Sequence, residues 1–376
     1  RTSPASPASP RTCPRTHRLA NTRRTGRMNA VFKMIKVGLG GIDTACVTPD
    51  GKQVVLLAGD KFILWSLKNG NRVCTVVERS LLTSVCVTPD STRVVVGSRN
   101  NVARMWKVGD GEAELVCTFR GHSDAVTSVC VTPDGQYLVT GSADSTSRVW
   151  NLSTGHHVRT LRGTRSTGVT SVSLTADGKR VVTVSCVPCT TRVWKLDSGE
   201  LLCVFNLGSF PTSTCLTPCG MNLLVASARS GAGSVAEARM FRLRDGALLR
   251  QFRLHSIWVS SMCVTPDGKH LVTGSFDDTG CVWNLLSGEC VRTLEGHSST
   301  VISCVTPDGK HVVTTSGDDT VRVWPLARAR WARLRLLFWV SRFLWWWSTL
   351  PYRPGSRQAV AAAREFGALA KRMKIN

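Results

Sequence analysis

A short turn motif recurs along most of this chain at intervals of 40 to 48 residues. Five copies read Thr-Pro-Asp, and two are the variants Thr-Ala-Asp and Thr-Pro-Cys. The copies begin at Thr48, Thr88, Thr132, Thr175, Thr217, Thr265 and Thr306. Self-similarity at such a period marks a repeat architecture, in which each unit buries its apolar face against its neighbours. The chain is therefore expected to fold as an array of seven similar units.

The residues around each turn favour short antiparallel strands. Pro suits the second position of a tight turn, and Asp and Gly suit the positions after it. The flanking runs, such as 136–140 and 269–273, are brief, rich in Val and partly alternating, as expected for strands with one buried face. Each unit then reaches an aromatic residue, namely Trp65, Trp106, Trp150, Trp194, Phe241, Trp283 and Trp324. The sequence thus predicts an all-β fold.

A small residue stands two positions before the turn Thr in every unit. It is Ser173 in the fourth unit and a cysteine in the others: Cys46, Cys86, Cys130, Cys215, Cys263 and Cys304. This pattern predicts a tightly packed inner strand in which free Cys behaves as a small hydrophobe. The cysteines number fifteen, and the chain is too long for a small disulfide-framed secreted domain. We therefore expect reduced thiols and an intracellular location, either cytoplasmic or nuclear.

Further polar residues recur in register with the turns. A Gly-His pair stands at Gly121-His122 and at Gly296-His297, and the sixth unit keeps the histidine as His255. In the same three units an Asp lies six residues before the Trp, and a Thr lies four residues before that Asp. Together with the period, these features resemble the WD-repeat (Trp-Asp repeat) family, although Asp follows none of the six Trp residues. The resemblance covers roughly residues 31–326 and implies a β-propeller with four strands in each blade.

The resemblance also implies a buried hydrogen-bonded tetrad in three blades. An Asp would accept a hydrogen bond from a His, the His would meet a Thr hydroxyl, and the hydroxyl would meet a Trp N–H. The members would be His122, Thr140, Asp144 and Trp150; His255, Thr273, Asp277 and Trp283; and His297, Thr314, Asp318 and Trp324. A His–Asp–Thr set can be mistaken for a catalytic group. Its recurrence in register with the fold favours a structural role.

The two ends of the repeat array complement each other. After Trp324 the last unit has no fourth strand, because Pro325 and an Arg-rich stretch follow. Residues Val31–Lys36 precede the first complete unit and align with the outer strand Cys290–Leu294. We therefore predict that this N-terminal strand completes the last blade. The result is a closed seven-bladed propeller of four-stranded antiparallel blades, without the exposed sheet edges that invite aggregation.

The formal net charge of +23 is concentrated in the two ends of the chain. Residues 1–28 hold seven Arg and no acidic residue, and residues 325–376 hold eleven Lys or Arg against one acid, Glu365. We predict three parts: a disordered basic leader over 1–28, the propeller over 29–326 and a basic, Trp-rich, helical segment over 327–376. For the leader, two other interpretations are a segment wrongly joined to the chain and a targeting segment.

Three interpretations of the C-terminal segment stay open. Residues 336–350 are largely apolar and contain Trp339, Trp345, Trp346 and Trp347, but fifteen residues are too few to span a bilayer. Basic residues beside Trp and Leu suit peripheral membrane contact through 331–350, or the docking of a partner. The segment could instead pack on the propeller, or be an artefact of gene prediction.

No motif indicates catalysis, a cofactor or a metal site. Cys186 and Cys189 form a lone Cys-x-x-Cys, whereas a structural zinc site needs a second pair of ligands. The stretch Ala228–Arg239 in the fifth unit is rich in small residues and is predicted to be a flexible spacer. We therefore expect a non-enzymatic protein without cofactor or metal.

The resemblance implies partner binding on the rim where the Gly-His loops and Asp turns emerge. Aromatic and Arg residues are the expected anchors there. The candidate residues are Trp258, Phe276, Arg99, Arg165, Asp124 and Ala143. In the alternative interpretation, Trp258 packs on its own blade. We predict a monomeric propeller that acts as a scaffold for a protein or peptide partner.

Two other functions compete with the scaffold. One is a nucleic-acid-associated or membrane-surface adaptor that acts through the basic tails. Nucleic acid is the less favoured partner, because the central part of the chain is only mildly basic. The other is a propeller enzyme, for which the sequence offers no acid/base pair outside the tetrads.

Overall fold

The computed structural model describes residues 33–326, apart from 39, 110, 164–167, 188 and 228–235. Over these ranges the chain forms 28 strands joined by turns, and it forms no helix. Accordingly, the described ranges contain no helix with the length and apolar character needed to cross a membrane. The basic leader 1–28 and the segment 327–376 lie outside the described residues, so their expected disorder, helicity and membrane contact stay predictions.

The strands form seven four-stranded sheets, which we number as blades 1 to 7. Blade 1 holds β2 (Thr44–Val47), β3 (Gln53–Ala58), β4 (Lys61–Ser66) and β5 (Arg72–Val77). Blade 2 holds β6 (Leu82–Val87), β7 (Arg93–Ser98), β8 (Val102–Val108) and β9 (Ala113–Arg120). Blade 3 holds β10 (Val126–Val131), β11 (Tyr137–Ser142), β12 (Thr146–Asn151) and β13 (His157–Arg162). Blade 4 holds β14 (Val169–Leu174), β15 (Arg180–Cys186), β16 (Cys189–Lys195) and β17 (Leu201–Asn206).

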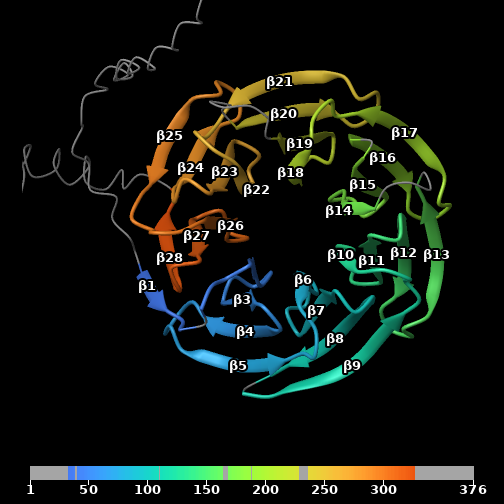
Figure 1. Cartoon of the computed structure of the whole chain (residues 1–376), viewed down its shortest axis with the longest axis horizontal. Helices are drawn as coiled ribbons and strands as arrows, with labels where there is room; N and C mark the ends of the chain where they lie inside the picture. The colour runs from blue at the N-terminus through green and yellow to red at the C-terminus, as the bar shows by residue number, and fades with distance from the viewer. Residues whose placement is uncertain are drawn as a thin grey trace, which may run out of the picture. The chain divides into compact units, whose positions relative to one another are not determined.

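The remaining three blades complete the array. Blade 5 holds β18 (Pro211–Leu216), β19 (Asn222–Ser227), β20 (Glu237–Arg242) and β21 (Leu248–Arg253). Blade 6 holds β22 (Val259–Val264), β23 (His270–Ser275), β24 (Gly280–Asn284) and β25 (Cys290–Leu294). Blade 7 holds β26 (Val301–Val305), β27 (His311–Ser316), β28 (Thr320–Pro325) and β1 (Lys33–Lys36). All neighbouring strands are antiparallel, and Figure 1 shows the seven blades around a common centre. The predicted fold is confirmed.

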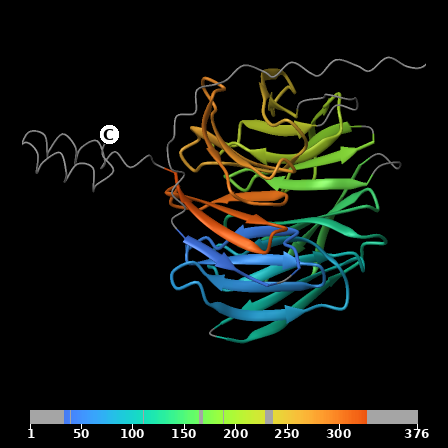
Figure 2. The same ribbon diagram turned by 60° about the vertical axis from the view of Figure 1, so that its left-hand side comes forward.

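The N-terminal strand closes the ring as predicted. β1 pairs with β28 in antiparallel register, with Lys33 opposite Val323 and Lys36 opposite Thr320. Ile35 is 6% exposed and packs in a core shared by blades 7 and 1. Figure 2 shows the blue β1 beside the red-orange β28. Chain segments almost 290 residues apart therefore make one sheet, and blade 7 lacks its outer strand without β1.

The antiparallel order gives the ring two different faces. The turns between first and second strands, and those between third and fourth strands, lie on one face because neighbouring strands run in opposite directions. This face carries the Thr-Pro-Asp turns, and we name it the Thr-Pro-Asp face. The other face carries the loops that lead into each inner strand, including the Gly-His pairs. We name it the Gly-His face.

Blade 3 shows why the turn motif needs these residue types. Thr132 Oγ1 donates to Asp134 Oδ1 at 2.5 Å and accepts the Tyr137 N–H at 3.0 Å. Asp134 also accepts the Gln136 N–H at 2.9 Å. Gly135 has a φ of 70°, a left-handed conformation that favours glycine. Thr and Asp therefore satisfy the polar groups of the turn, and Gly provides its shape.

Neighbouring blades share apolar cores. One such core joins Val95 and Phe119 of blade 2 to Val126, Leu138 and Trp150 of blade 3, and each of these side chains is at most 2% exposed. Because the apolar face of one blade is covered by the next, no blade is an independent folding unit.

Side-chain hydrogen bonds also link the inner strands of neighbouring blades. Ser84 Oγ accepts the Val129 N–H at 3.2 Å, and Ser128 Oγ accepts the Val172 N–H at 3.1 Å. The inner-strand cysteines lie among these contacts. Burial raises the pKa of Cys130 to about 11, so its thiol stays protonated at neutral pH. This cysteine fills space as a small hydrophobe.

The predicted flexible spacer of the fifth unit is wrong at its C-terminal end. Strand β20 begins at Glu237, so Glu237–Arg239 belong to the blade. Ala236 and Ala238 are at most 2% exposed, and Glu237 Oε2 accepts a hydrogen bond from Gln251 Nε2 at 2.7 Å. Small residues occur here because the third strand is packed on both sides. Residues 228–235 lie outside the described ranges.

Candidate functional site

Blade 3 contains a continuous chain of four polar side chains. His122 Nδ1 lies 2.8 Å from Asp144 Oδ2, and His122 Nε2 lies 2.8 Å from Thr140 Oγ1. Trp150 Nε1 donates to the same Thr hydroxyl at 2.9 Å. The indole can only donate and the carboxylate can only accept, so Nδ1 carries the proton and Nε2 accepts from Thr140. Every member of this tetrad then has a partner.

Blades 6 and 7 repeat the same geometry. Each of their six tetrad hydrogen bonds measures between 2.7 and 3.0 Å. The members are His255, Thr273, Asp277 and Trp283 in blade 6, and His297, Thr314, Asp318 and Trp324 in blade 7. The three histidine side chains are at most 2% exposed. A substrate therefore has no access to them, and the sets act within the fold.

Burial and hydrogen bonding fix the protonation states in these tetrads. Burial lowers the pKa of His122 and of His297, although Asp144 and Asp318 oppose that shift. Burial alone would raise the pKa of Asp318, but hydrogen bonds from Thr320 and His297 outweigh it and lower the pKa to about 2. A neutral imidazole next to an ionised carboxylate is the arrangement that the hydrogen-bond chain requires.

The other blades depart from the tetrad in ways that the repeat pattern did not predict. In blade 2, Glu78 stands at the position of His122, accepts the Trp106 N–H at 3.0 Å and forms an ion pair with Arg104. A signal for this exchange was present, because Glu78 and His122 lie four residues before their inner strands. In blade 1, Trp65 Nε1 is buried and has no hydrogen-bond partner among the described residues.

Two exposed aromatic side chains stand together on the Gly-His face of blade 6. Trp258 precedes β22 and Phe276 follows β23, and the Phe276 N–H donates to the Trp258 carbonyl at 3.0 Å. The ring centroids are 6.4 Å apart at an interplanar angle of 84°. Trp258 is 58% exposed and Phe276 is 49% exposed. The packing of Trp258 on its own blade is thus only partial, and more than half of the side chain faces solvent.

A pocket of about 460 Å³ lies beside this aromatic pair. Four consecutive blades line it, where their inner strands begin. Besides the two aromatic residues, its lining includes Thr212 of blade 5, Ser260 of blade 6, Thr300 and Ile302 of blade 7, and Ile42 and Asp43 at the start of blade 1. The lining combines apolar walls, hydroxyl groups and one carboxylate. Such a surface suits an apolar side chain flanked by polar backbone groups.

The structure separates the other predicted rim residues from this pocket. Arg99 of blade 2 and Asp124 of blade 3 are exposed, and Ala143 of blade 3 is half-buried. None of these three lines the pocket, which is formed by blades 5, 6, 7 and 1. Arg165 lies outside the described residues. Of the six predicted rim residues, Trp258 and Phe276 line this pocket, and partner binding by all six stays a prediction.

The sequence pattern missed one exposed aromatic residue near the pocket. Phe210 directly precedes the inner strand of blade 5, as Trp258 does in blade 6, and it is 58% exposed. Thr212, two residues further on, lines the pocket. Alignment of the residues before each inner strand could have identified Phe210. It extends the apolar surface of the Gly-His face toward blade 5.

Potential metal ligands do not gather in the part of the chain that the structure describes. No group of three or more His, Cys, Asp or Glu residues there could hold a metal ion. Cys186 and Cys189 face each other across a hairpin, where Cys189 Sγ contacts the Cys186 carbonyl at 2.7 Å.

Comparison with protein families matches this chain to the description "WD domain, G-beta repeat". Five segments match: 71–107, 113–151, 155–195, 246–284 and 288–325. Together they cover more than half of the chain. The chain belongs to the WD-repeat family. The two repeats without a match are those that end at Trp65, whose indole N–H has no partner, and at Phe241, which replaces the Trp.

Several WD-repeat and other proteins are similar to this chain. WD repeat-containing protein 18 of Danio rerio is 24% identical over 272 residues, which are 69% of this chain and 54% of that protein. Autophagy-related protein 16 of Arabidopsis thaliana is 26% identical over 242 residues, 64% of this chain and 46% of that protein. The ribosome biogenesis protein BOP1 homolog of Drosophila erecta is 51% identical over 44 residues, 12% of this chain and 6% of that protein.

This chain spans about half the length of the first two of these relatives. WD-repeat propellers generally act as scaffolds for protein interactions and are typically non-catalytic.

Proposed function

We propose that this chain is an interaction scaffold that binds a protein or peptide partner in the pocket beside Trp258 and Phe276. The observation that carries the proposal is the exposure of both rings above a pocket that four blades share. Large aromatic side chains are frequent anchors of protein interfaces, and burying one completely contributes about 1.5–3 kcal/mol. The partner would insert an apolar side chain between these rings and Ile302.

Polar groups around the pocket would orient the partner's backbone. Asp43 is a potential acceptor, although its Oδ2 already accepts the Gly59 N–H at 2.7 Å. The hydroxyl of Thr300 offers both a donor and an acceptor. The matched relatives bear names from different cellular processes, which supports partner binding in general and favours none of those processes.

A double substitution, Trp258→Ala with Phe276→Ala, tests the proposal. The matched control is Leu81→Ala, because Leu81 occupies the position of Trp258 in blade 2 and is 49% exposed. We expect the double variant to lose partners that the wild-type chain and the control retain in quantitative capture from cells, with unchanged circular dichroism. Equal capture by all three proteins would show that the partner binds elsewhere.

A further inference from the structure

Four blades carry a cation at the same position of the outer strand. Each cation pairs with a residue of the third strand. That paired residue comes directly before the repeat's Trp, or before Phe241 in blade 5. These cations are Arg159 in blade 3, Arg250 in blade 5, Arg292 in blade 6 and Lys33 in blade 7.

Three of the four cations donate hydrogen bonds to the next blade. Lys33 Nζ donates to the Leu67 carbonyl at 3.1 Å and to the Lys68 carbonyl at 2.8 Å. Arg292 Nη1 donates to the Pro325 carbonyl at 2.6 Å. Arg250 Nη1 donates likewise to two carbonyls that follow β24. The common role of this position is therefore to join adjacent blades by binding the carbonyls that end the third strand.

Arg159 is the exception. The corresponding carbonyls of blade 4 belong to Leu196 and Asp197, and within the described ranges Arg159 donates to neither. Its Nε is buried and has no hydrogen-bond partner among those residues. A buried N–H without a partner is unfavourable, and Arg159 lacks the hydrogen bonds across the blade junction that its three counterparts make.

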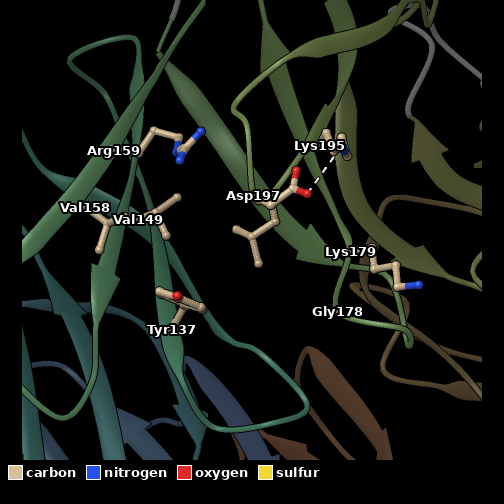
Figure 3. Close-up of a pocket in the computed structure, with 9 residues that line it drawn as sticks. Tyr137, Val149, Val158, Arg159, Gly178, Lys179, Lys195 and Asp197 are labelled. Atoms are coloured by element: carbon tan, nitrogen blue, oxygen red, sulfur yellow. Dashed lines mark ion pairs between the residues drawn. The ribbon is translucent and has the colours of Figure 1, made fainter.

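The space at this junction is a cleft of about 390 Å³ between blades 3 and 4. Figure 3 shows Arg159, Val149, Val158 and Tyr137 on one side and Lys195, Asp197 and Lys179 on the other. The Arg159 side chain packs against Gly199, since an added Cβ there would lie 2.7 Å from Arg159 Cδ. Apolar groups therefore form one wall, while charged groups from both blades surround the opening.

The charges of the cleft do not balance. Among the described residues that line the cleft, Arg159, Lys179 and Lys195 face one carboxylate, Asp197, which forms an ion pair with Lys195 at 3.3 Å. The described residues that line the cleft therefore carry a surplus of two positive charges. A phosphoryl group carries about −1.5 to −2 at pH 7 and three acceptor oxygens, whereas a carboxylate would neutralise only half of the surplus.

We propose that the cleft between blades 3 and 4 binds a phosphorylated side chain of a peptide. Arg159 provides the central charged donor, and Lys179 and Lys195 supply the remaining positive charge. Val158, which is 45% exposed, contacts the aliphatic neighbours of the phosphorylated residue. The site lies on the Thr-Pro-Asp face, away from the aromatic pocket. It is therefore independent of the function proposed for the Gly-His face.

The test measures fluorescence anisotropy of the full chain with three labelled peptide mixtures. Each mixture has aliphatic flanking residues and a fixed central residue, which is phosphoserine, serine or glutamate. We expect phosphoserine to bind at least tenfold more tightly than serine, because hydrogen bonds to charged groups contribute about this much. Arg159→Gln should weaken phosphoserine binding about tenfold or more.

Arg250→Gln is the matched control, because Arg250 holds the same position but already binds carbonyls. It should change the affinity less than twofold. Equal binding of the serine or glutamate mixture, or equal losses in the two variants, would overturn the proposal. Inorganic phosphate that binds as tightly as the peptide would also overturn it, because the cleft would then take free phosphate.

A gain-of-binding variant avoids the ambiguity of a folding defect. Asp197 is 71% exposed, so Asp197→Asn should leave the fold intact. It removes the one carboxylate among the described residues that line the cleft. We expect phosphoserine binding to tighten about threefold through reduced repulsion, with no change for the serine mixture. Unchanged phosphoserine affinity would contradict the proposed placement of the anion.

Discussion

Blades 1 and 3 place a Trp at the same position but surround it differently. In blade 3, Trp150 donates to Thr140, and the tetrad is complete. In blade 1, Leu56 occupies the position of Thr140, and Trp65 Nε1 is buried without a partner among the described residues. Both blades nevertheless have four strands and well-buried cores. Strand register and apolar packing therefore suffice to form a blade, and the tetrad adds stability by satisfying buried polar groups.

Blade 2 provides a third kind of partner for the buried Trp N–H. Glu78 is 5% exposed and binds both the Trp106 indole and the Arg104 guanidinium. A carboxylate that accepts from two donors replaces the His–Thr pair of blade 3. The comparison suggests that the cost of disrupting a blade depends on how many buried polar groups lose their partners.

The largest effect is expected in blade 2. Glu78→Ala leaves both Arg104 and Trp106 without their acceptor, and should lower the free energy of unfolding by about 3 kcal/mol. Urea denaturation followed by Trp fluorescence would measure this loss. Glu200→Ala, at an exposed turn residue, is the control and should change stability by less than about 0.5 kcal/mol. Similar losses for both variants would show that the Glu78 contacts contribute little.

The next effect separates a complete tetrad from a partial one. Thr140→Val preserves shape but leaves His122 Nε2 and Trp150 Nε1 without a partner, and should cost about 2–3 kcal/mol. In blade 4, Thr183 accepts the Trp194 N–H at 3.0 Å and no histidine among the described residues, so Thr183→Val should cost about 1–2 kcal/mol. The two urea midpoints should therefore differ. If Thr183→Val costs as much as Thr140→Val, the histidine adds nothing to the blade.

Acid should weaken the tetrad blades in two stages. The pKa of His122 and His297 is lower in the folded chain than the ordinary 6.5, so unfolding takes up protons below that pH. Stability should be full above about pH 6.5 and decrease as the pH falls below it. Asp318 has a folded pKa of about 2 against 3.8, so a second decrease begins below pH 3.8. Urea midpoints from pH 8 to about pH 2 would show both stages.

A variant that lacks two of the tetrad histidines tests the cause of the first stage. With His122→Gln and His297→Gln together, the decrease between pH 6.5 and pH 5 should become smaller. The second stage should remain, because carboxylates of the Thr-Pro-Asp turns, such as Asp134, also have lowered pKa values. An unchanged first stage would assign it to other groups.

The smallest effect is expected where a Trp has no partner. Trp65→Phe removes an unpaired N–H and should cost less than about 1 kcal/mol, whereas Trp150→Phe should cost about 2 kcal/mol because Thr140 loses a donor. Thermal unfolding of the two variants would compare them directly. Equal shifts in Tm would mean that packing volume, and not the hydrogen bond, decides the contribution of these Trp residues.

The sequence predicts the periodic parts of this molecule well and the exceptions poorly. The turn period, the closing strand at Lys33–Lys36 and the three tetrads follow from residues that recur at fixed offsets. The role of Glu78 was not predicted, because a single Glu in blade 2 replaces the His–Thr pair that the pattern leads one to expect. The rim residues Arg99 and Asp124 were grouped with Trp258 because position in the repeat does not tell which blades share a pocket. That grouping depends on the order of blades around the ring.

The cleft at Arg159 was not predictable for a similar reason. Arg159 and Arg250 occupy equivalent positions, and only their contacts across the blade junction differ. The repeat pattern places an Arg at both positions, and it does not tell which of the two donates a hydrogen bond to the next blade.

The most direct test of the scaffold proposal places a photoreactive amino acid, p-benzoylphenylalanine, at Phe276 or at Arg99 in cells. The two positions are equivalent in blades 6 and 2, and both are exposed. We expect cross-linking to a discrete partner from position 276 and none from position 99. Cross-linking from position 99 with none from position 276 would contradict the assignment of the partner site to blade 6.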